Sequence, residues 1–237
     1  MAPERLDKLL SKCLPLSRSE LKKAAKAGLV TLNGEAVSDL SVKVDGNADS
    51  VLFDGKKVNI DEFLYIMLNK PKGVICATDG RGEKTVLDLL PDELKRSGLF
   101  PAGRLDKDTT GFVLITDDGD FAHRILSPKN HVEKTYIAVL DQPVDKKGIK
   151  QLENGITLND GTQFLPAKLK ALNDEKTVIE IKICEGKYHE IKRMFKAVGC
   201  EVTELERTVI GGLPLDGKLK QGEARLITAE EKVRLIK

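Results

Sequence analysis

A loop between two glycines in the middle of the chain carries residues that could do chemistry. Residues 103–111 read GRLDKDTTG and directly precede an apolar run that predicts a strand, Phe112–Thr116. The carboxylate of Asp106 could act in a cleft as a nucleophile or a base, and Arg104 could hold an anion. The same composition is common in plain turns, where Asp and Thr side chains bond to the backbone. Asp106 and Asp108 do not by themselves predict a metal site, because no further ligand cluster accompanies them.

Two later segments carry further candidate groups. Residues 133–136, EKTY, lead into a predicted strand, where Tyr136 could equally be a core or sheet-edge residue. Residues 185–196, EGKYHEIKRMFK, lie where a strand ends and a helix begins, with Lys192 and Arg193 away from the apolar stripe. These cations indicate either a solvated helix face or a surface that binds an anion. His189 alone does not indicate catalysis, because the chain has three histidines and none lies at helical pair spacing with another.

The elements that must position these groups alternate between strands and helices from residue 63 onward. The predicted strands are Tyr65–Leu68, Phe112–Thr116, Tyr136–Leu140 and Val178–Ile183. The predicted helices are Phe121–Leu126, Val144–Glu153, Glu190–Val198 and a last one that opens with Thr228-x-x-Glu231. Strands that arrive in runs and pairs, with few regular β-α-β units, favour an α+β fold with a largely antiparallel mixed sheet flanked by helices and loops.

The first sixty residues predict a smaller unit of another kind. Apolar spacing indicates a helix over Leu6–Cys13, and a second helix opens at the capping box of Ser17 and Glu20 and stops at Gly28. Small hairpins follow, with turns at Asn33-Gly34 and Asp54-Gly55. The polar stretch 59–62 is a candidate linker. We therefore expect two domains, residues 1–60 and residues 61–237.

Composition excludes several classes of protein. Of the 237 residues, 41% are hydrophobic and 32% are charged, which is typical of a globular chain. No apolar run approaches the ~20 residues of a membrane-spanning helix. Charges occupy the N-terminus, where a secretion signal would need an apolar core. We expect a cytoplasmic protein with no membrane partner. The four cysteines form no C-x-x-C pair, so neither a disulfide framework nor a zinc site is predicted.

The net charge of +2 conceals two basic segments. Residues 1–30 hold seven Lys and Arg against three Asp and Glu, and residues 182–196 hold five against two. In the second predicted helix, Arg18, Lys22 and Lys26 lie off the apolar face, where they suit backbone phosphates or simply solvent. With 4% aromatic residues, an extended platform for stacking bases is disfavoured.

Taken in order, the motifs resemble two known families. The runs RLDKLL, SRSEL and GLVTLNGEAV, within residues 3–58, resemble the S4 RNA-binding domain. The remainder, residues 63–230, is similar to the RsuA-type pseudouridine synthases, in which an N-terminal S4 domain is usual. That similarity rests on GRLD-x-x-T-x-G, EKTY, GKYHEIKRMF-x-AVG and, near the end, L-x-R-x-x-IGGL-x-L followed by GE-x-R. The resemblance implies an S4 domain that binds structured RNA through its two-helix face, followed by a synthase domain.

The resemblance also implies roles for individual residues. Asp106 is the carboxylate that acts at C1′ of the target uridine, either by attack or as a base on the sugar. Lys192 matches the basic partner of that carboxylate, with the adjacent Arg193 as the second choice. Tyr136 would stack on the target base, and its hydroxyl could help to remove the C5 proton. The further residues expected to contact RNA are Arg104, His189 and Arg193 in the synthase domain, and Arg5, Arg18, Lys22 and Lys26 in the S4 domain.

Pseudouridine formation breaks the N1–C1′ bond and joins C5 to C1′ without redox change or energy input, so no cofactor or metal is expected. The Tyr188-His189 pair and Lys192 are most similar to family members that act on 16S ribosomal RNA of the small subunit. We expect 16S RNA, or a small-subunit assembly intermediate, as the partner of a monomeric enzyme. The alternatives are a large-subunit (23S) enzyme of the same family and a non-catalytic RNA-binding assembly factor. A third alternative, a small-molecule enzyme with an S4-like appendage, is disfavoured because this sequence has no nucleotide-binding or metal-binding motif.

Overall fold

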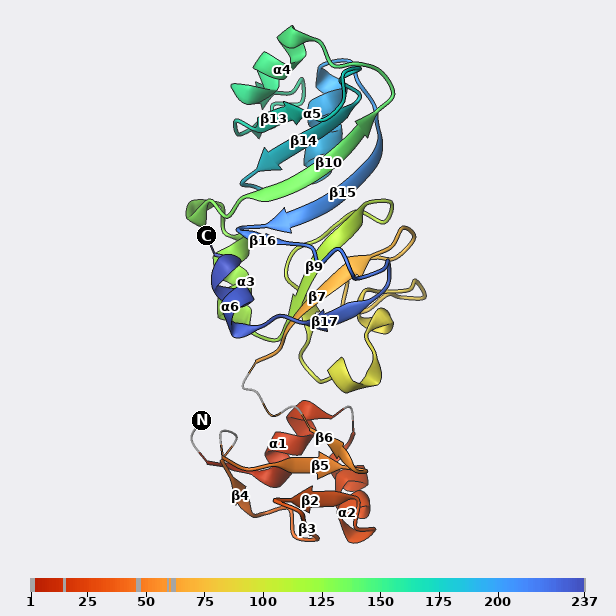
Figure 1. Cartoon of the computed structure of the whole chain (residues 1–237), viewed down its shortest axis with the longest axis vertical. Coiled ribbons are helices and arrows are strands. Elements are labelled where there is room, and N and C mark those ends of the chain that lie inside the picture. Colours follow the sequence, from red (N-terminus) through yellow and green to blue (C-terminus); the bar gives the residue numbers. More distant parts are fainter. Residues whose placement is uncertain (1–2, 15, 46–47, 59, 61–62, 237) are drawn as a thin grey trace.

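The computed structural model describes residues 3–14, 16–45, 48–58, 60 and 63–236. Figure 1 shows a small N-terminal part below a larger part that begins after residue 62. Each part has its own apolar core: one core draws only on residues between Leu6 and Ile60, and two others draw only on residues from Phe63 onward. Most of the proposed linker, residues 59–62, lies outside the described residues. Ile60 is described, and it packs against the N-terminal core.

Two helices and a small sheet form the N-terminal part. The helices are α1 (Leu6–Cys13) and α2 (Arg18–Lys26). One sheet has the order β3-β2-β5-β6, with β2 (Val30–Leu32), β3 (Glu35–Ala36), β5 (Val51–Phe53) and β6 (Lys56–Lys57), and β1 (Glu4–Arg5) pairs with β4 (Lys43–Val44). Both hairpin turns have positive φ at their two central residues, as expected: Asn33 and Gly34 in one, Asp54 and Gly55 in the other.

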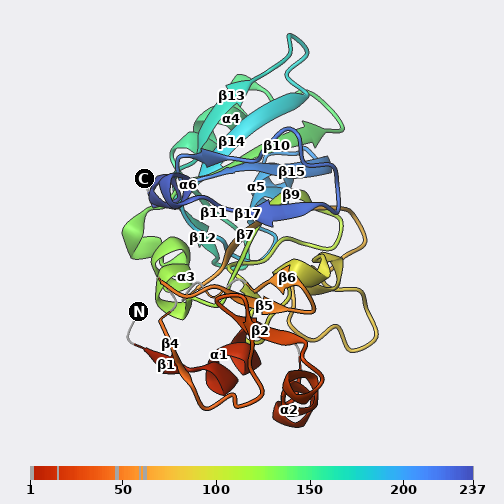
Figure 2. The same ribbon diagram turned by 60° about the horizontal axis from the view of Figure 1, so that its bottom comes forward.

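The capping box at the start of α2 is also confirmed. Ser17 Oγ accepts from the Glu20 N–H, and Glu20 Oε2 accepts from the Ser17 N–H at 2.7 Å. The apolar residues Leu21 and Ala25 are buried, which leaves Arg18, Lys22 and Lys26 exposed. Helix α2 lies at the outer end of the N-terminal part (Figure 2), whereas α1 faces the larger part, where Ser97 Oγ donates to the Lys12 carbonyl at 3.1 Å.

A long mixed sheet is the frame of the larger part. Its order is β13-β14-β10-β15-β9-β7-β17, and β8 and β16 pair at its sides. The strands are β7 (Tyr65–Lys70), β8 (Phe100–Pro101), β9 (Thr110–Thr116), β10 (Lys134–Leu140), β13 (Lys168–Ala171), β14 (Val178–Ile183), β15 (Val202–Ile210), β16 (Leu213–Pro214) and β17 (Ala224–Leu226). A separate hairpin joins β11 (Ile156–Thr157) to β12 (Gln163–Phe164). Within the described residues of this sheet, β9 and β15 pair parallel and the other strand pairs are antiparallel. The predicted α+β class with a largely antiparallel sheet is confirmed.

Helices cover both faces of this sheet. They are α3 (Gly119–Leu126), α4 (Lys146–Glu153), α5 (Glu190–Ala197) and α6 (Ala229–Arg234), with short 3-10 turns η1 (Leu87–Leu89), η2 (Asp92–Leu94) and η3 (Pro128–Asn130). Alternate residues of β7 face opposite cores: Ile66 joins the core that contains α4 and α5, and Met67 joins the core of α3. Every residue of β7 and β9 is therefore buried. No helix within the described ranges is long and apolar enough to cross a bilayer.

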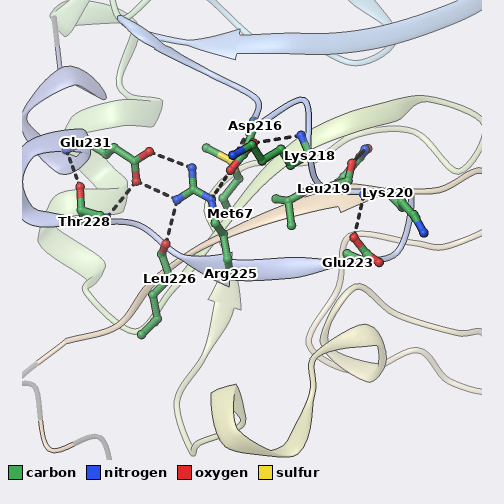
Figure 3. Close-up of polar contacts among 11 residues, drawn as sticks. Met67, Asp216, Lys218, Leu219, Lys220, Glu223, Arg225, Leu226, Thr228 and Glu231 are labelled. Carbon is green, nitrogen blue, oxygen red and sulfur yellow. Dashed lines mark hydrogen bonds and ion pairs between the residues drawn. The ribbon is translucent and has the colours of Figure 1, made fainter.

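The C-terminal GE-x-R motif has a structural explanation. Arg225 of β17 lies between two carboxylates (Figure 3), with Asp216 Oδ2 2.7 Å from its Nε and the Glu231 oxygens 2.8 Å from its two terminal nitrogens. Glu231 also caps α6 through Thr228. Arg225 thus fastens the last helix to the edge of the sheet, next to the segment that follows β16.

Candidate active site

The glycine-bracketed loop connects β8 to β9 and reaches the neighbouring strand β15. Gly111 makes this approach possible, because its φ is +97° and a Cβ there would lie 2.3 Å from the Arg207 carbonyl oxygen. The Thr109 N–H donates to the Asp106 carbonyl at 3.1 Å, which closes a turn inside the loop. Asp106 therefore lies in a tight turn that directly precedes β9, a fully buried strand.

A buried lysine at the end of β7 holds this loop through hydrogen bonds to its backbone carbonyls. Lys70, the last residue of β7, is 0% exposed, and its Nζ donates to the carbonyls of Asp106 at 3.0 Å, Lys107 at 3.3 Å and Thr109 at 2.7 Å. Burial lowers the pKa of Lys70. No motif in the sequence had singled out Lys70. The available signal was a lysine two residues beyond the apolar run Tyr65–Leu68, followed by proline at position 71.

Lys192 brings a positive charge to the loop from the first turn of α5. Its Nζ lies 3.4 Å from Asp106 Oδ2, and 2.6 and 2.7 Å from the two carboxylate oxygens of Asp108. The ammonium group therefore lies between two carboxylates of one turn and makes its shorter contacts with Asp108. The hydrogen bond from Lys192 lowers the pKa of Asp108.

The chain enters α5 through a strained residue. His189, the N-cap, has a left-handed backbone with φ of +49°, a conformation that is costly for a residue with a side chain. The imidazole lies next to the loop, with its Nε2 3.4 Å from Asp106 Oδ1. Tyr188 stacks on the imidazole with 3.8 Å between ring centroids and leaves 72% of its own surface exposed.

Tyr136 approaches the loop from β10, on the other side. It is 7% exposed, and the strand register places it opposite Arg207 of β15. Arg207 is buried; its Nη1 donates to the Tyr136 hydroxyl at 3.3 Å, and its Nε donates to the Phe112 carbonyl at 2.7 Å. Among the described residues, nothing accepts a hydrogen bond from its Nη2. Arg207 was also missed as a site residue, because the strand that carries it was not predicted.

These groups converge on one cleft. Its lining includes Arg104, Asp106, Tyr136, His189 and Lys192. Arg104 is exposed at the edge. The cleft thus combines a carboxylate beside a cation with an aromatic ring and apolar side chains, among them Ile183 and Leu205. Such a set can act on a sugar carbon that bears a planar ring, since carboxylates of this kind serve at glycosidic bonds.

Arg193 turns away from the cleft. Its guanidinium donates to Asp160 at 2.5 Å and to the Thr162 hydroxyl at 3.0 Å, and it lies over the Phe164 ring at 5.4 Å. In this structure Lys192 lies beside Asp106 and Arg193 pairs with the β11–β12 hairpin, so the geometry favours Lys192 over Arg193 as the partner of Asp106. In the N-terminal part, Arg5 is exposed and pairs with Asp7 at 2.9 Å.

A second carboxyl group is buried beside the cleft. Glu190, at the first turn of α5, is 4% exposed, and its Oε2 accepts from the Lys187 N–H at 2.8 Å. Burial above all, with the neighbouring Glu185 carboxylate adding to it, raises the pKa of Glu190 to about 7. The unfolded chain should titrate near the ordinary value of 4.5.

This shift predicts a pH-dependent stability that Glu190→Gln removes. Between about pH 4.5 and 7 the folded wild type binds the Glu190 proton more tightly than the unfolded chain, so its unfolding free energy falls as the pH rises. A neutral glutamine has no such loss. From pH 4.5 to 8 the variant should therefore gain up to about 3 kcal/mol relative to wild type. Chemical denaturation across this range measures it.

The exposed Glu153, at the end of α4, supplies the matched control. Glu153→Gln should follow the wild-type pH dependence within error. An equal pH dependence of wild type and Glu190→Gln would show that this carboxyl does not titrate with a raised pKa.

The chain is similar to known proteins along nearly its whole length. Residues 64–197 match the profile of the RNA pseudouridylate synthase family, and residues 4–50 match that of the S4 domain. An uncharacterized RNA pseudouridine synthase, YtzG of Bacillus subtilis (strain 168), is 46% identical over 229 residues, which are 96% of each chain. Ribosomal small subunit pseudouridine synthase A of Escherichia coli (strain K12) is 43% identical over 229 residues, 96% of this chain and 97% of the relative.

A solved structure is also similar over nearly the full length. A crystal structure of a pseudouridylate synthase is 40% identical, has a TM-score of 0.68, and covers 98% of this chain and 99% of its own. With the matched profile extending over more than half of the residues and with relatives above 40% identity end to end, the chain belongs to the RNA pseudouridylate synthase family and is an isomerase of the RsuA type with an N-terminal S4 domain.

Proposed function

We propose that this protein converts a specific uridine of 16S ribosomal RNA to pseudouridine without a cofactor, and that Asp106 is the residue that acts at C1′. The observation that carries the proposal is the meeting of Asp106, Lys192 and Tyr136 in one cleft, with Lys192 Nζ 3.4 Å from the Asp106 carboxylate. A protein that only binds RNA has no chemical reason to combine these three groups.

The reaction requires a negative group next to the ribose. The N1–C1′ bond breaks, the uracil turns, C5 bonds to C1′, and the C5 proton leaves while N1 gains one, so atoms and electrons balance within the nucleoside. Asp106 serves either by attack on C1′ or by removing a proton from the sugar. The cation of Lys192 favours the ionised carboxylate and holds its orientation. The reaction needs a carboxylate that is both ionised and held in one orientation, and the neighbouring ammonium group meets both needs.

Tyr136 has the position to hold the base. Its ring forms part of the cleft and its hydroxyl is fixed by Arg207, so the ring offers one stacking surface for a flipped uracil. The hydroxyl is the candidate group for removing the C5 proton. Arg104 is exposed at the rim, where we expect it to contact a phosphate or to fill the space that the flipped base leaves. We expect His189 to contact the RNA.

The S4 domain supplies a second RNA contact. Arg18, Lys22 and Lys26 form an exposed row on α2, and Arg5 lies on the same domain. We take residues 1–60 as the RNA-binding domain and residues 61–237 as the catalytic domain. Because one chain contributes every residue of the cleft, we propose a monomer that works in the cytoplasm on 16S RNA or on a small-subunit assembly intermediate.

The choice of 16S RNA is supported by the relatives. Proteins named ribosomal small subunit pseudouridine synthase A, from Yersinia pestis and Escherichia coli, are 42% and 43% identical along 96% of this chain. The Tyr188-His189 sequence at the cleft agrees with that choice. A large-subunit target remains the alternative within the family.

The test is position-resolved mapping of pseudouridine after purified protein is added to unmodified 16S RNA, unmodified 23S RNA and partly assembled small subunits. The expected result is one new pseudouridine in 16S RNA, in the free or the assembled form. Modification of 23S RNA alone would move the target to the large subunit. Binding to RNA with no pseudouridine in any substrate would identify a non-catalytic assembly factor instead.

A further inference from the structure

The ammonium group of Lys192 is shared unequally between two carboxylates. Asp108 receives it at 2.6 and 2.7 Å through both oxygens, while Asp106 receives it at 3.4 Å through one. Asp108 lies outside the Arg-Leu-Asp triplet, and its side chain is 68% exposed against 28% for Asp106. The shorter contacts therefore go to the carboxylate with no assigned part in the chemistry.

The chemistry of lysine explains why a second carboxylate matters. An ammonium group at the end of a four-carbon chain is a flexible point charge and cannot grip a carboxylate through a planar fork, as arginine does. Lys192 alone would have several rotamers near Asp106. The two contacts with Asp108 select the one in which Nζ remains beside the reacting carboxylate.

The backbone fixes the spacing of the two carboxylates. Asp106 and Asp108 belong to the same turn, closed by the Thr109 N–H on the Asp106 carbonyl, and Lys70 ties the carbonyls of that turn to the end of β7. Asp108 therefore moves with Asp106 as one rigid piece, and an ammonium held by Asp108 keeps a constant place relative to Asp106.

We propose that Asp108 is a positioning residue for the pseudouridine reaction: it anchors Lys192 at Asp106 and replaces the second hydrogen bond that an arginine would supply. The inference rests on the proposed function of this cleft. It assigns no contact with RNA to Asp108, which acts only through Lys192.

A double-mutant comparison tests the proposal, because it predicts rescue. In the wild-type background, Asp108→Asn should lower kcat for pseudouridine formation by about 10-fold with little change in KM, since a displaced charge at the reacting carboxylate slows the chemical step. In the Lys192→Arg background the same substitution should change kcat less than about twofold, since a guanidinium can hold Asp106 with two parallel N–H groups.

Glu83→Gln is the matched control. It removes another ion pair of the same loop, Lys107–Glu83, whose two side chains are exposed, and it should leave kcat unchanged. A loss of kcat in this control equal to that of Asp108→Asn would assign the effect to the loop rather than to Lys192. Equal losses for Asp108→Asn in both backgrounds, or no loss in either, would overturn the proposal.

Crystal structures of the wild type and of Asp108→Asn give a readout without RNA. Nζ of Lys192 should lie between the two carboxylates in the wild type and leave that place in the variant; an unchanged Nζ would also overturn the proposal. Absence of pseudouridine with wild-type protein would refute the proposed function instead, so the two failures are distinguishable.

Discussion

Replacing Asp106 by asparagine should abolish pseudouridine formation while RNA binding stays close to that of the wild type. Asparagine has nearly the same shape but can neither attack C1′ nor take a proton from the sugar, and it offers Lys192 no charge. We expect kcat to fall by at least about 10³-fold. Release of tritium from C5 of labelled uridine in 16S RNA measures the turnover, and filter binding measures the affinity.

The variant should fold normally for a structural reason. The turn around Asp106 is held by its backbone carbonyl, which accepts from Lys70 at 3.0 Å and from the Thr109 N–H at 3.1 Å, and neither contact involves the carboxylate. Asp174→Asn, at an exposed position between β13 and β14, is the control and should retain full turnover. Normal tritium release by Asp106→Asn would refute the catalytic assignment.

Neutralising the basic face of α2 should weaken RNA binding strongly and change the chemistry little. The triple variant Arg18→Gln, Lys22→Gln and Lys26→Gln would remove the three phosphate contacts that we propose for this face. Each phosphate contact releases counterions, so the loss of three should lower the affinity by about 100-fold at 0.1 M salt. The slope of log Kd plotted against log salt concentration should become smaller by about 2 to 3. The measurements are Kd at several salt concentrations and KM at one of them.

A charge-matched variant shows whether the site matters. Lys146, Lys147 and Lys150 lie exposed on α4, also within a short helix, and their replacement by glutamine removes the same net charge. If only total charge governs binding, both triple variants will lose the same affinity. If α2 is the RNA-binding face, the α4 variant will keep most of it. An unchanged salt slope in the α2 variant would refute the phosphate contacts.

The elements with strong local signals were predicted within one or two residues. Val178–Ile183 alternates apolar and polar residues and is β14 with the same bounds, and the Ser17–Glu20 capping box begins α2 as expected. In these segments the side-chain period and the cap are properties of neighbouring residues, so the sequence carries the information locally.

Strand β15 shows where local pattern fails. Arg207 breaks its alternation, because it occupies the position between Leu205 and Val209 where the sequence pattern calls for an apolar residue, and burial is uneven along the strand. It lies in the middle of the sheet, between β10 and β9. Both of these strands are far from β15 in the sequence. Arg207, which this strand places against Tyr136, could not be located before the strand was known.

The sequence alone indicates two kinds of domain, and the family resemblance of its motifs points to Asp106 as the reacting carboxylate and to a basic residue beside it. Tertiary structure alone decided how these groups meet. It gave Lys192 and the adjacent Arg193 different partners: Lys192 lies beside Asp106, whereas Arg193 pairs with Asp160 in the β11–β12 hairpin. It also placed the Lys70 ammonium under the loop and the Asp108 carboxylate against Lys192, contacts that join residues 36 and 84 positions apart. Local periodicity cannot encode such contacts, since they depend on the register of distant strands and the direction in which a helix begins.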